Sequence, residues 1–289
     1  MAELLDGKAT AAKLNELLKE EIDEEVKTSG KRKPSLAIIL VGNDKASETY
    51  VRNKVRSGEK IGIDTTVFRY DENASASEFE KKMHELNEDR SIDGILLQLP
   101  LPKPFKPLER YFLSLISPDK DVDCLSYENI GRLYVDKNAE ILPATPKGIM
   151  SLLKEYSIDV SGKKVCIIGR SDIVGKPLAR LMERENATVT LCHSHTEMLK
   201  TFTLNSDIIV TAVGKPKFFG REFFDYGSKK VIVDVGINRV DGKLCGDVDF
   251  GSVLDVCSHI TPVPGGIGPM TIWGMNSNVV SLWKRHFSK

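Results

Sequence analysis

A tyrosine and a lysine four residues apart are the first side chains whose spacing could support chemistry. Tyr50 and Lys54 lie in a segment, residues 47–61, that is predicted to be a helix. Residues at this spacing share one helix face, so the ring could stack on a flat substrate beside a positioned amine. An ordinary surface helix also carries such pairs, and the spacing alone leaves both interpretations open.

Other polar groups could join this pair. Gln98 interrupts an apolar run at the end of a predicted buried strand, and a buried amide must find a polar partner. It could orient Lys54 or bond the backbone. Asp119, Asp121 and Asp123 alternate in an irregular segment, which is typical of a solvated loop. One of them facing inward would accept a hydrogen bond from an amino group on a heterocycle.

A second ligand-binding pattern follows the apolar strand predicted at 164–168. Gly169 and Gly175 bracket a turn before a predicted helix, where a Rossmann fold places a pyrophosphate against helix amides. The middle glycine of G-x-G-x-x-G is absent, so an ordinary strand-to-helix turn remains an alternative. Farther on, residues 261–269 hold three glycines among prolines. This loop would let backbone approach a ligand closely, or would simply lead into the last helix.

The next predicted strand of this half indicates which dinucleotide is bound. It ends in Cys192-His193-Ser194-His195-Thr196, where an NAD enzyme generally has an acidic residue for the ribose hydroxyls. Arg170 and Ser194 could instead hold a ribose phosphate, which favours NADP over NAD. Adjacent side chains at a strand end point in different directions, and no second ligand pair is evident. We therefore predict no metal site there.

The elements that must position these residues alternate between strands and helices. This pattern predicts an α/β fold with an N-terminal α/β catalytic domain and a C-terminal Rossmann-type dinucleotide-binding domain. A length of 289 residues also favours two domains. The predicted strands are 36–41, 65–70, 94–99, 164–168, 188–192, 207–212 and 230–235, and the predicted helices are 9–27, 47–61, 75–88, 146–156, 175–184 and 270–287.

The composition excludes several classes of partner. The chain has 41 basic and 41 acidic residues, so no overall field would draw it to nucleic acid or to an anionic membrane. It has no run of eighteen apolar residues and no recognisable targeting segment, which predicts a cytoplasmic location. The five cysteines show no C-x-x-C spacing and are expected to be reduced, largely buried thiols.

Taken together, the motifs closely resemble the methylenetetrahydrofolate dehydrogenase/cyclohydrolase family in order and spacing over nearly the whole chain. The resemblance implies a homodimer of one-carbon metabolism and purine biosynthesis, with a folate cleft between two domains. The domains would be residues 1–145, with a closing helix at about 270–289 packing back on them, and residues 146–269. The motifs are Tyr50-Val51-Arg52-Asn53-Lys54, the segment from Asp93 to Pro102, Pro118 to Asp123, Gly169-Arg170-Ser171 and Pro264 to Thr271.

The same resemblance implies the activity: NADP-dependent oxidation of methylene-tetrahydrofolate to the methenyl form, then hydrolysis to formyl-tetrahydrofolate. Lys54 would be the central residue of hydrolysis, held by Gln98, while Tyr50 orients the folate ring and Asp123 binds the pterin. Burial would lower the pKa of Lys54, so that it could act as a base or proton shuttle. Further folate contacts would be Val51, Arg52, Asn53, Leu97, Leu99, Pro264, Gly265, Gly266, Ile267 and Gly268, and NADP contacts would be Gly169, Arg170, Ser171, Ser194 and Ile237.

Several departures from the family pattern accompany the match, including Gly58 and Ala144 in place of cysteines. Cys124 and Leu125 stand after Asp123, where the family usually has glycine and then an aromatic residue or leucine, and Trp273 to Asn278 replaces a more apolar stretch. The competing interpretations are an NADP dehydrogenase without hydrolase activity, a homologue that only binds folate or dinucleotide, and an unrelated Rossmann oxidoreductase. Retention of Tyr50, Lys54 and Gln98 argues against a pure binding module.

Overall fold

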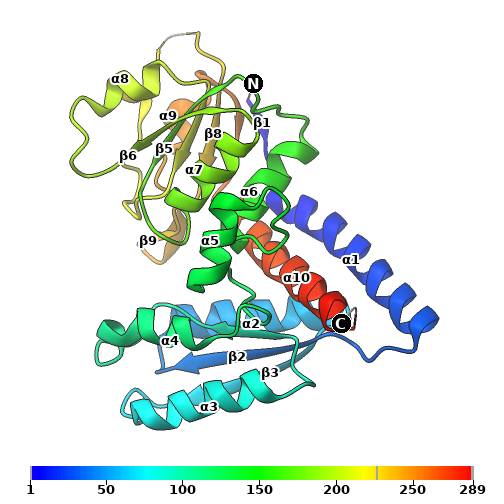
Figure 1. Cartoon of the computed structure of the whole chain (residues 1–289). Coiled ribbons are helices and arrows are strands. Elements are labelled where there is room, and N and C mark those ends of the chain that lie inside the picture. The colour runs from blue at the N-terminus through cyan, green and yellow to red at the C-terminus, as the bar shows by residue number, and fades with distance from the viewer. Residues whose placement is uncertain (1, 226, 288–289) are drawn as a thin grey trace. The chain divides into compact units, whose positions relative to one another are not determined.

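The chain forms two compact units, each with its own parallel sheet. Figure 1 shows the computed structural model, which describes residues 2–225 and 227–287. The three-stranded unit comprises Lys13–Ala144 and the chain from Ile272 onward, and the six-stranded unit comprises the chain up to Ala12 and Thr145–Thr271. The α/β class predicted from the sequence is confirmed by these sheets.

The sheet of the three-stranded unit has the order β3-β2-β4, with all strands parallel. Strand β2 is central and buried, as its unbroken apolar sequence predicts. Helix α2 lies on one side of the sheet and α3 on the other (Figure 1). The elements are β2 Ser35–Val41, α2 Lys45–Lys60, β3 Asp64–Tyr70, α3 Ala76–Glu88, β4 Gly94–Leu97, η1 Lys106–Leu108, α4 Glu109–Leu115 and α5 Tyr127–Val135.

The six-stranded sheet has the order β1-β11-β8-β7-β5-β6 and is parallel throughout. Strands β5 and β6 and helix α7 have the predicted bounds. An antiparallel hairpin, β9-β10, stands apart from the sheet. The elements are β1 Glu3–Leu4, β5 Lys164–Ile168, α7 Gly175–Arg184, β6 Thr188–Cys192, α8 Leu199–Leu204, β7 Ile208–Thr211, η2 Arg221–Phe223, β8 Lys230–Asp234, β9 Asn238–Val240, β10 Lys243–Cys245, α9 Phe250–Val253 and β11 Cys257–Ile260.

The boundary of the units differs from the predicted division at residue 145. Strand β1 pairs with β11, so the first twelve residues cluster with the dinucleotide half of the sequence. A two-residue strand carries no periodic signal, which is why the sequence did not indicate it. The chain passes from one unit to the other within or beside three helices, which are α1 Gly7–Ser29, α6 Ala144–Glu155 and α10 Ile267–His286.

The cysteines agree with the prediction of reduced, largely buried thiols. All five cysteines are free thiols, and four of them are buried. Within residues 2–225 and 227–287, no helix combines the length and the apolar character needed to cross a membrane.

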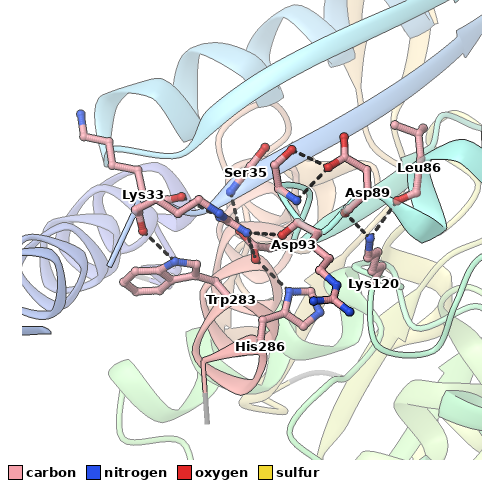
Figure 2. A network of polar contacts seen from close by, with 11 residues as sticks. Lys33, Ser35, Leu86, Asp89, Asp93, Lys120, Trp283 and His286 are labelled. Carbon is pink, nitrogen blue, oxygen red and sulfur yellow. Dashed lines mark hydrogen bonds and ion pairs between the residues drawn. The ribbon is translucent and has the colours of Figure 1, made fainter. Parts of the chain in front are cut away.

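A polar network fastens the end of α10 inside the three-stranded unit (Figure 2). Asp93 is completely buried at the start of β4 and accepts two hydrogen bonds from Arg32, at 2.6 and 2.9 Å. It also accepts from the Ser35 amide at 2.8 Å and contacts Nδ1 of His286 at 2.8 Å. The Trp283 indole donates to the Arg32 carbonyl at 2.9 Å. The strand that leads to Gln98 is therefore anchored at its other end.

Asp93→Asn should lower the free energy of unfolding by about 2–3 kcal/mol at pH 7, because charge-assisted bonds are lost. Burial alone would raise the pKa of Asp93, but the bonds from His286, Arg32 and Ser35 outweigh burial and lower it. This stabilisation is present above the unfolded pKa of about 3.9 and is lost as pH falls through the lower folded pKa. Urea unfolding at several pH values should show the difference shrinking below about pH 4, with exposed Asp64→Asn as control.

Candidate functional site

The Lys54 amine is enclosed beside the end of β4. Lys54 is 5% exposed, and its Nζ donates to Oε1 of Gln98 at 3.2 Å. The Gln98 Nε2 donates to the Leu99 carbonyl at 2.6 Å, which fixes the orientation of the amide. The sequence left open whether Gln98 meets Lys54 or the backbone, and the structure contains both contacts. The Lys54 Nζ also lies 5.1 Å from the centre of the Tyr50 ring.

Charge and burial act against each other at this amine. Burial lowers the pKa of Lys54, and the nearby Asp123 carboxylate partly opposes this. Burial likewise raises the pKa of Asp123, against the attraction of Lys54. Desolvation therefore moves both groups toward their neutral forms. A lysine in this state can exchange a proton nearer neutral pH than an exposed one.

The loop that carries Asp123 is held by two polar side chains, Asp121 and Asn278. The Asp121 carboxylate accepts from the amides of Leu125 and Ser126, at 3.1 and 2.8 Å, so this member of the acidic run is structural. Asn278 of α10 is fully buried and donates to the carbonyls of Val122 and Leu142, both at 2.7 Å. The loop position of Asp123 thus depends on the closing helix, within the same unit.

Cys124 occupies a backbone conformation that explains why glycine is usual in the family. Its φ of 57° lies in the left-handed region, where a side chain is unfavourable. The side chain is nevertheless buried, and its Sγ contacts the Ile141 carbonyl at 3.3 Å. Cys124 therefore fits the loop without displacing Asp123 from the environment of Lys54.

The remaining predicted folate residues of this unit do not all face the amine. Val51 and Leu97 are buried, and Leu97 belongs to the apolar core under the sheet. Arg52 and Asn53 are exposed, and Arg52 donates to the Thr49 hydroxyl at 3.2 Å. Leu99 is partly exposed. The structure thus brings together Tyr50, Lys54, Gln98 and Asp123.

In the six-stranded unit, the turn after β5 is tightly packed. A Cβ on Gly175 would lie 1.9 Å from the Gly169 carbonyl oxygen, so only glycine allows α7 to begin there. Gly169 itself has φ +128° and lies against the Ala212 carbonyl. The Ser171 hydroxyl accepts from the amides of Val174 and Gly175, at 3.2 and 3.4 Å. These two amides are therefore satisfied within the turn.

The predicted cofactor residues follow strands β5, β6 and β8 at the carboxyl end of this parallel sheet. Strands β5 and β6 pair, and the Gly169 amide donates to the Cys192 carbonyl at 2.9 Å. Arg170 and Ser194 follow these two strands and are exposed, and Ile237, after β8, is 56% exposed. The carboxyl ends of parallel strands are where such sheets bind nucleotides. No cluster of metal-binding side chains occurs within the described ranges.

The glycine-rich loop before α10 belongs to the six-stranded unit. Gly265 has φ +108°, and its carbonyl accepts from the Lys8 amide at 2.8 Å. A Cβ on Gly268 would lie 3.9 Å from Cδ1 of Ile237. The predicted folate loop and a predicted cofactor residue are therefore neighbours within one unit. Pro264 is exposed, whereas Gly266 and Ile267 are buried.

A pair of buried carboxylates in this unit was not found from the sequence. Asp234 ends β8 and Asp247 follows β10, and both are at most 3% exposed. Burial raises the pKa of Asp234 to about 6, against the amides of Val248, Asp247 and Gly236 that donate to it. An aspartate ending an apolar strand was the available signal for Asp234. Nothing local to residue 247 indicated its partners.

The fold and both sites define a two-unit nucleotide-binding α/β enzyme. Comparison with known families assigns residues 5–123 to the tetrahydrofolate dehydrogenase/cyclohydrolase catalytic domain and residues 143–287 to the NAD(P)-binding domain of that family. The chain therefore belongs to the tetrahydrofolate dehydrogenase/cyclohydrolase family. The predicted bifunctional folate enzyme and its use of a nicotinamide dinucleotide are confirmed at this level.

Individual relatives cover the whole chain. It is similar to the bifunctional protein FolD of Agathobacter rectalis, with 48% identity over 99% of this chain and 100% of the relative. A crystal structure of the Campylobacter jejuni bifunctional FolD matches with 42% identity, a TM-score of 0.94 and 99% coverage of both chains. The Trypanosoma brucei FolD, solved with NADP and an inhibitor, matches with 34% identity, a TM-score of 0.94 and coverage of 100% and 99%.

Proposed function

We propose that this chain oxidises 5,10-methylene-tetrahydrofolate with NADP and hydrolyses the methenyl product to 10-formyl-tetrahydrofolate, with Lys54 as the central residue of hydrolysis. The observation that carries the proposal is the enclosed Lys54 amine, which is bonded to Gln98 and lies beside Tyr50 and Asp123. Burying an amine costs free energy. Two other buried lysines, Lys120 and Lys230, each donate to two backbone carbonyls, whereas Lys54 donates to the side-chain amide of Gln98.

In hydrolysis, Lys54 acts first as the base for the attacking water and then as the acid for N5. Its neutral amine accepts a proton as the water oxygen bonds to the methenyl carbon, and it returns a proton to N5 as the carbon–N5 bond breaks. The hydroxyl left on that carbon loses its proton as the C=O bond forms, so the net result is addition of water and release of one proton. Gln98 holds the amine in place, Tyr50 orients the ring system and Asp123 accepts from the pterin. The Pro264–Gly268 backbone is proposed to contact the folate as well.

In oxidation, the protein mainly orients the reactants. The nicotinamide ring, when bound, supplies the hydride acceptor. The glycines Gly169 and Gly175 let β5 turn tightly into α7, as the pyrophosphate-binding turn of a Rossmann fold requires. Arg170 and Ser194 are exposed at adjacent strand ends, and no carboxylate stands between residues 192 and 196 to repel a ribose phosphate. These features support NADP over NAD, with Ser171 and Ile237 as further contacts.

The direct test mixes the protein with methylene-tetrahydrofolate and NADP and follows NADPH and the methenyl chromophore together. NADPH formation without build-up of the methenyl compound is expected, because hydrolysis keeps pace. Accumulation of the methenyl product would indicate a dehydrogenase alone. No NADPH under any condition would indicate a homologue that only binds its ligands.

Asp123→Asn should move the acid limb of the hydrolysis pH profile to lower pH. The Asp123 carboxylate raises the pKa of Lys54, so its removal lets burial lower that pKa further. The neutral amine is then available at lower pH. The turnover number of the cyclohydrolase at saturating substrate is the quantity to follow between pH 5 and pH 9. An acid limb that moves to higher pH, or does not move, would contradict the assignment of Lys54 as the base.

We also propose the location and assembly implied by the family resemblance. The five free thiols are typical of a reducing compartment, which supports a cytoplasmic enzyme. A homodimer that supplies one-carbon units, including those for purine biosynthesis, and that binds no nucleic acid completes the proposal. Sedimentation at several protein concentrations tests the dimer.

A further inference from the structure

A buried carboxylate near the carboxyl end of the six-stranded sheet, where the cofactor is proposed to bind, accepts hydrogen bonds from four donors. Asp247 is fully buried. Its Oδ2 accepts from the amides of Val213 and Gly214, at 2.7 and 3.2 Å, and its Oδ1 accepts from the amide of Lys215 and the Nδ2 of Asn238, both at 2.9 Å. Charge-assisted bonds of this kind are the strong ones in proteins.

These bonds join the segments that leave two neighbouring strands. Residues 213–215 follow β7, and Asn238 follows β8 by four residues, and β7 pairs with β8. The first segment adjoins Ala212, whose carbonyl lies against the cofactor glycine Gly169. The second contains Ile237. One carboxylate therefore links both sides of the proposed dinucleotide site.

Asp247 is itself locked to the end of β8. Its amide donates to Oδ1 of Asp234 at 3.0 Å, and the Gly236 amide donates to the same oxygen at 3.0 Å. A Cβ on Gly236 would lie 2.2 Å from Oδ1 of Asp247, so the backbone before Ile237 passes directly over the carboxylate. Ile237 is thus held on both sides, by Gly236 and by Asn238.

We propose that Asp247 is a positioning residue for the dinucleotide, which acts by fixing Ile237 relative to the 213–215 segment. The inference rests on the proposed function, which places the cofactor at the carboxyl end of the six-stranded sheet. Ile237 needs such support because its side chain is 56% exposed and lies next to Gly268 of the glycine-rich loop. The carboxylate touches neither ligand, so its effect must pass through these neighbours.

Asp247→Asn is a sharp perturbation because every partner of the carboxylate is a donor. Whichever way an amide is turned, its NH₂ group faces backbone N–H groups or the Asn238 amide. The expected result is a dissociation constant for NADP that is weaker by about tenfold, measured by fluorescence titration with NADPH. Cyclohydrolase turnover from added methenyl-tetrahydrofolate should change less than twofold, because that reaction uses no dinucleotide.

A double-mutant cycle separates positioning from a general loss of stability. If Asp247 acts through Ile237, the effects of Asp247→Asn and Ile237→Ala on NADP affinity will be non-additive. If Asp247→Asn does not fold, Asn238→Ala removes one donor and should weaken NADP by about threefold, again non-additively with Ile237→Ala. Asp255→Asn, an exposed site in the same unit, is the matched control.

The outcomes are distinguishable from those of the proposed function. Wild type that neither binds NADPH nor hydrolyses the methenyl compound would overturn the proposed function. Wild type that does both, together with unchanged NADP affinity in the folded Asp247→Asn or Asn238→Ala protein, would overturn only the role of Asp247. Additive effects with Ile237→Ala would likewise overturn it.

Discussion

Lys54→Met should reduce hydrolysis of methenyl-tetrahydrofolate by about 10²–10⁴-fold, the usual contribution of a positioned acid or base. Methionine fills much of the space of the lysine stem and removes a charge that is costly to bury. The bond to Gln98 Oε1, the contact with the Tyr50 ring and the attraction of Asp123 are lost, but the new side chain is apolar and of similar length, so the folded state should persist. NADPH should still form from methylene-tetrahydrofolate, and the methenyl product should now accumulate. NADPH formation and the methenyl absorption band, followed continuously in one reaction, measure the two steps.

The matched control is Lys60→Met on the same helix. Lys60 is exposed and ends α2, so its replacement should leave both rates near wild type. Rapid hydrolysis by the folded Lys54→Met protein would refute the assignment of Lys54. Loss of the far-ultraviolet helix signal would instead indicate that Lys54→Met unfolds. In that case Lys54→Gln, which keeps a polar group near Gln98, is the variant to test.

Arg170→Ala should weaken NADP far more than NAD, by about 10–100-fold for NADP against less than threefold for NAD. A charge-assisted hydrogen bond contributes about 1.5–3 kcal/mol, and only NADP has the ribose phosphate that would receive it. Arg170 is exposed after β5, so its removal leaves the packed turn at Gly169 intact. The Michaelis constants for both cofactors, measured with one folate concentration, give the two ratios.

Lys229→Ala provides the comparison for general charge effects. Lys229 is an exposed cation that precedes β8, whereas Arg170 follows β5, so the two lie at opposite ends of the parallel sheet. Its replacement should alter neither cofactor selectively. Equal losses for NADP and NAD in Arg170→Ala would rule out a phosphate contact by this guanidinium.

The strongly periodic elements could be predicted from sequence, and the short ones could not. Lys164–Ile168 and Gly175–Arg184 have the predicted bounds because a buried strand and an amphipathic helix each repeat their pattern several times. The nine-residue helix at Tyr127–Val135 lies in a stretch for which no element was predicted, where charged and turn-forming neighbours obscured it. The strand Glu3–Leu4 exists only because a distant strand pairs with it.

The site, like the fold, could be predicted from the sequence only in part. Tyr50, Lys54, Gln98 and Asp123 were predicted from motifs, and the structure gathers them around one amine. The support for Asp123 comes from Asn278, 156 residues away from the carbonyl of Val122 that it bonds. Such tertiary partners leave no local pattern, so the positioning of the site could not be read from spacing alone.

The pairing of β1 with β11 sets the order in which the chain can mature during synthesis. Glu3 lies opposite His259, and the Leu5 amide bonds to the Ile260 carbonyl at 2.9 Å. The ribosome must therefore add about 250 residues after β1 before that strand has its partner. Until then Leu5, which is fully buried in the folded protein, is exposed to solvent and to chaperones. At usual elongation rates of about 5–20 residues per second, that interval is on the order of 10–50 s.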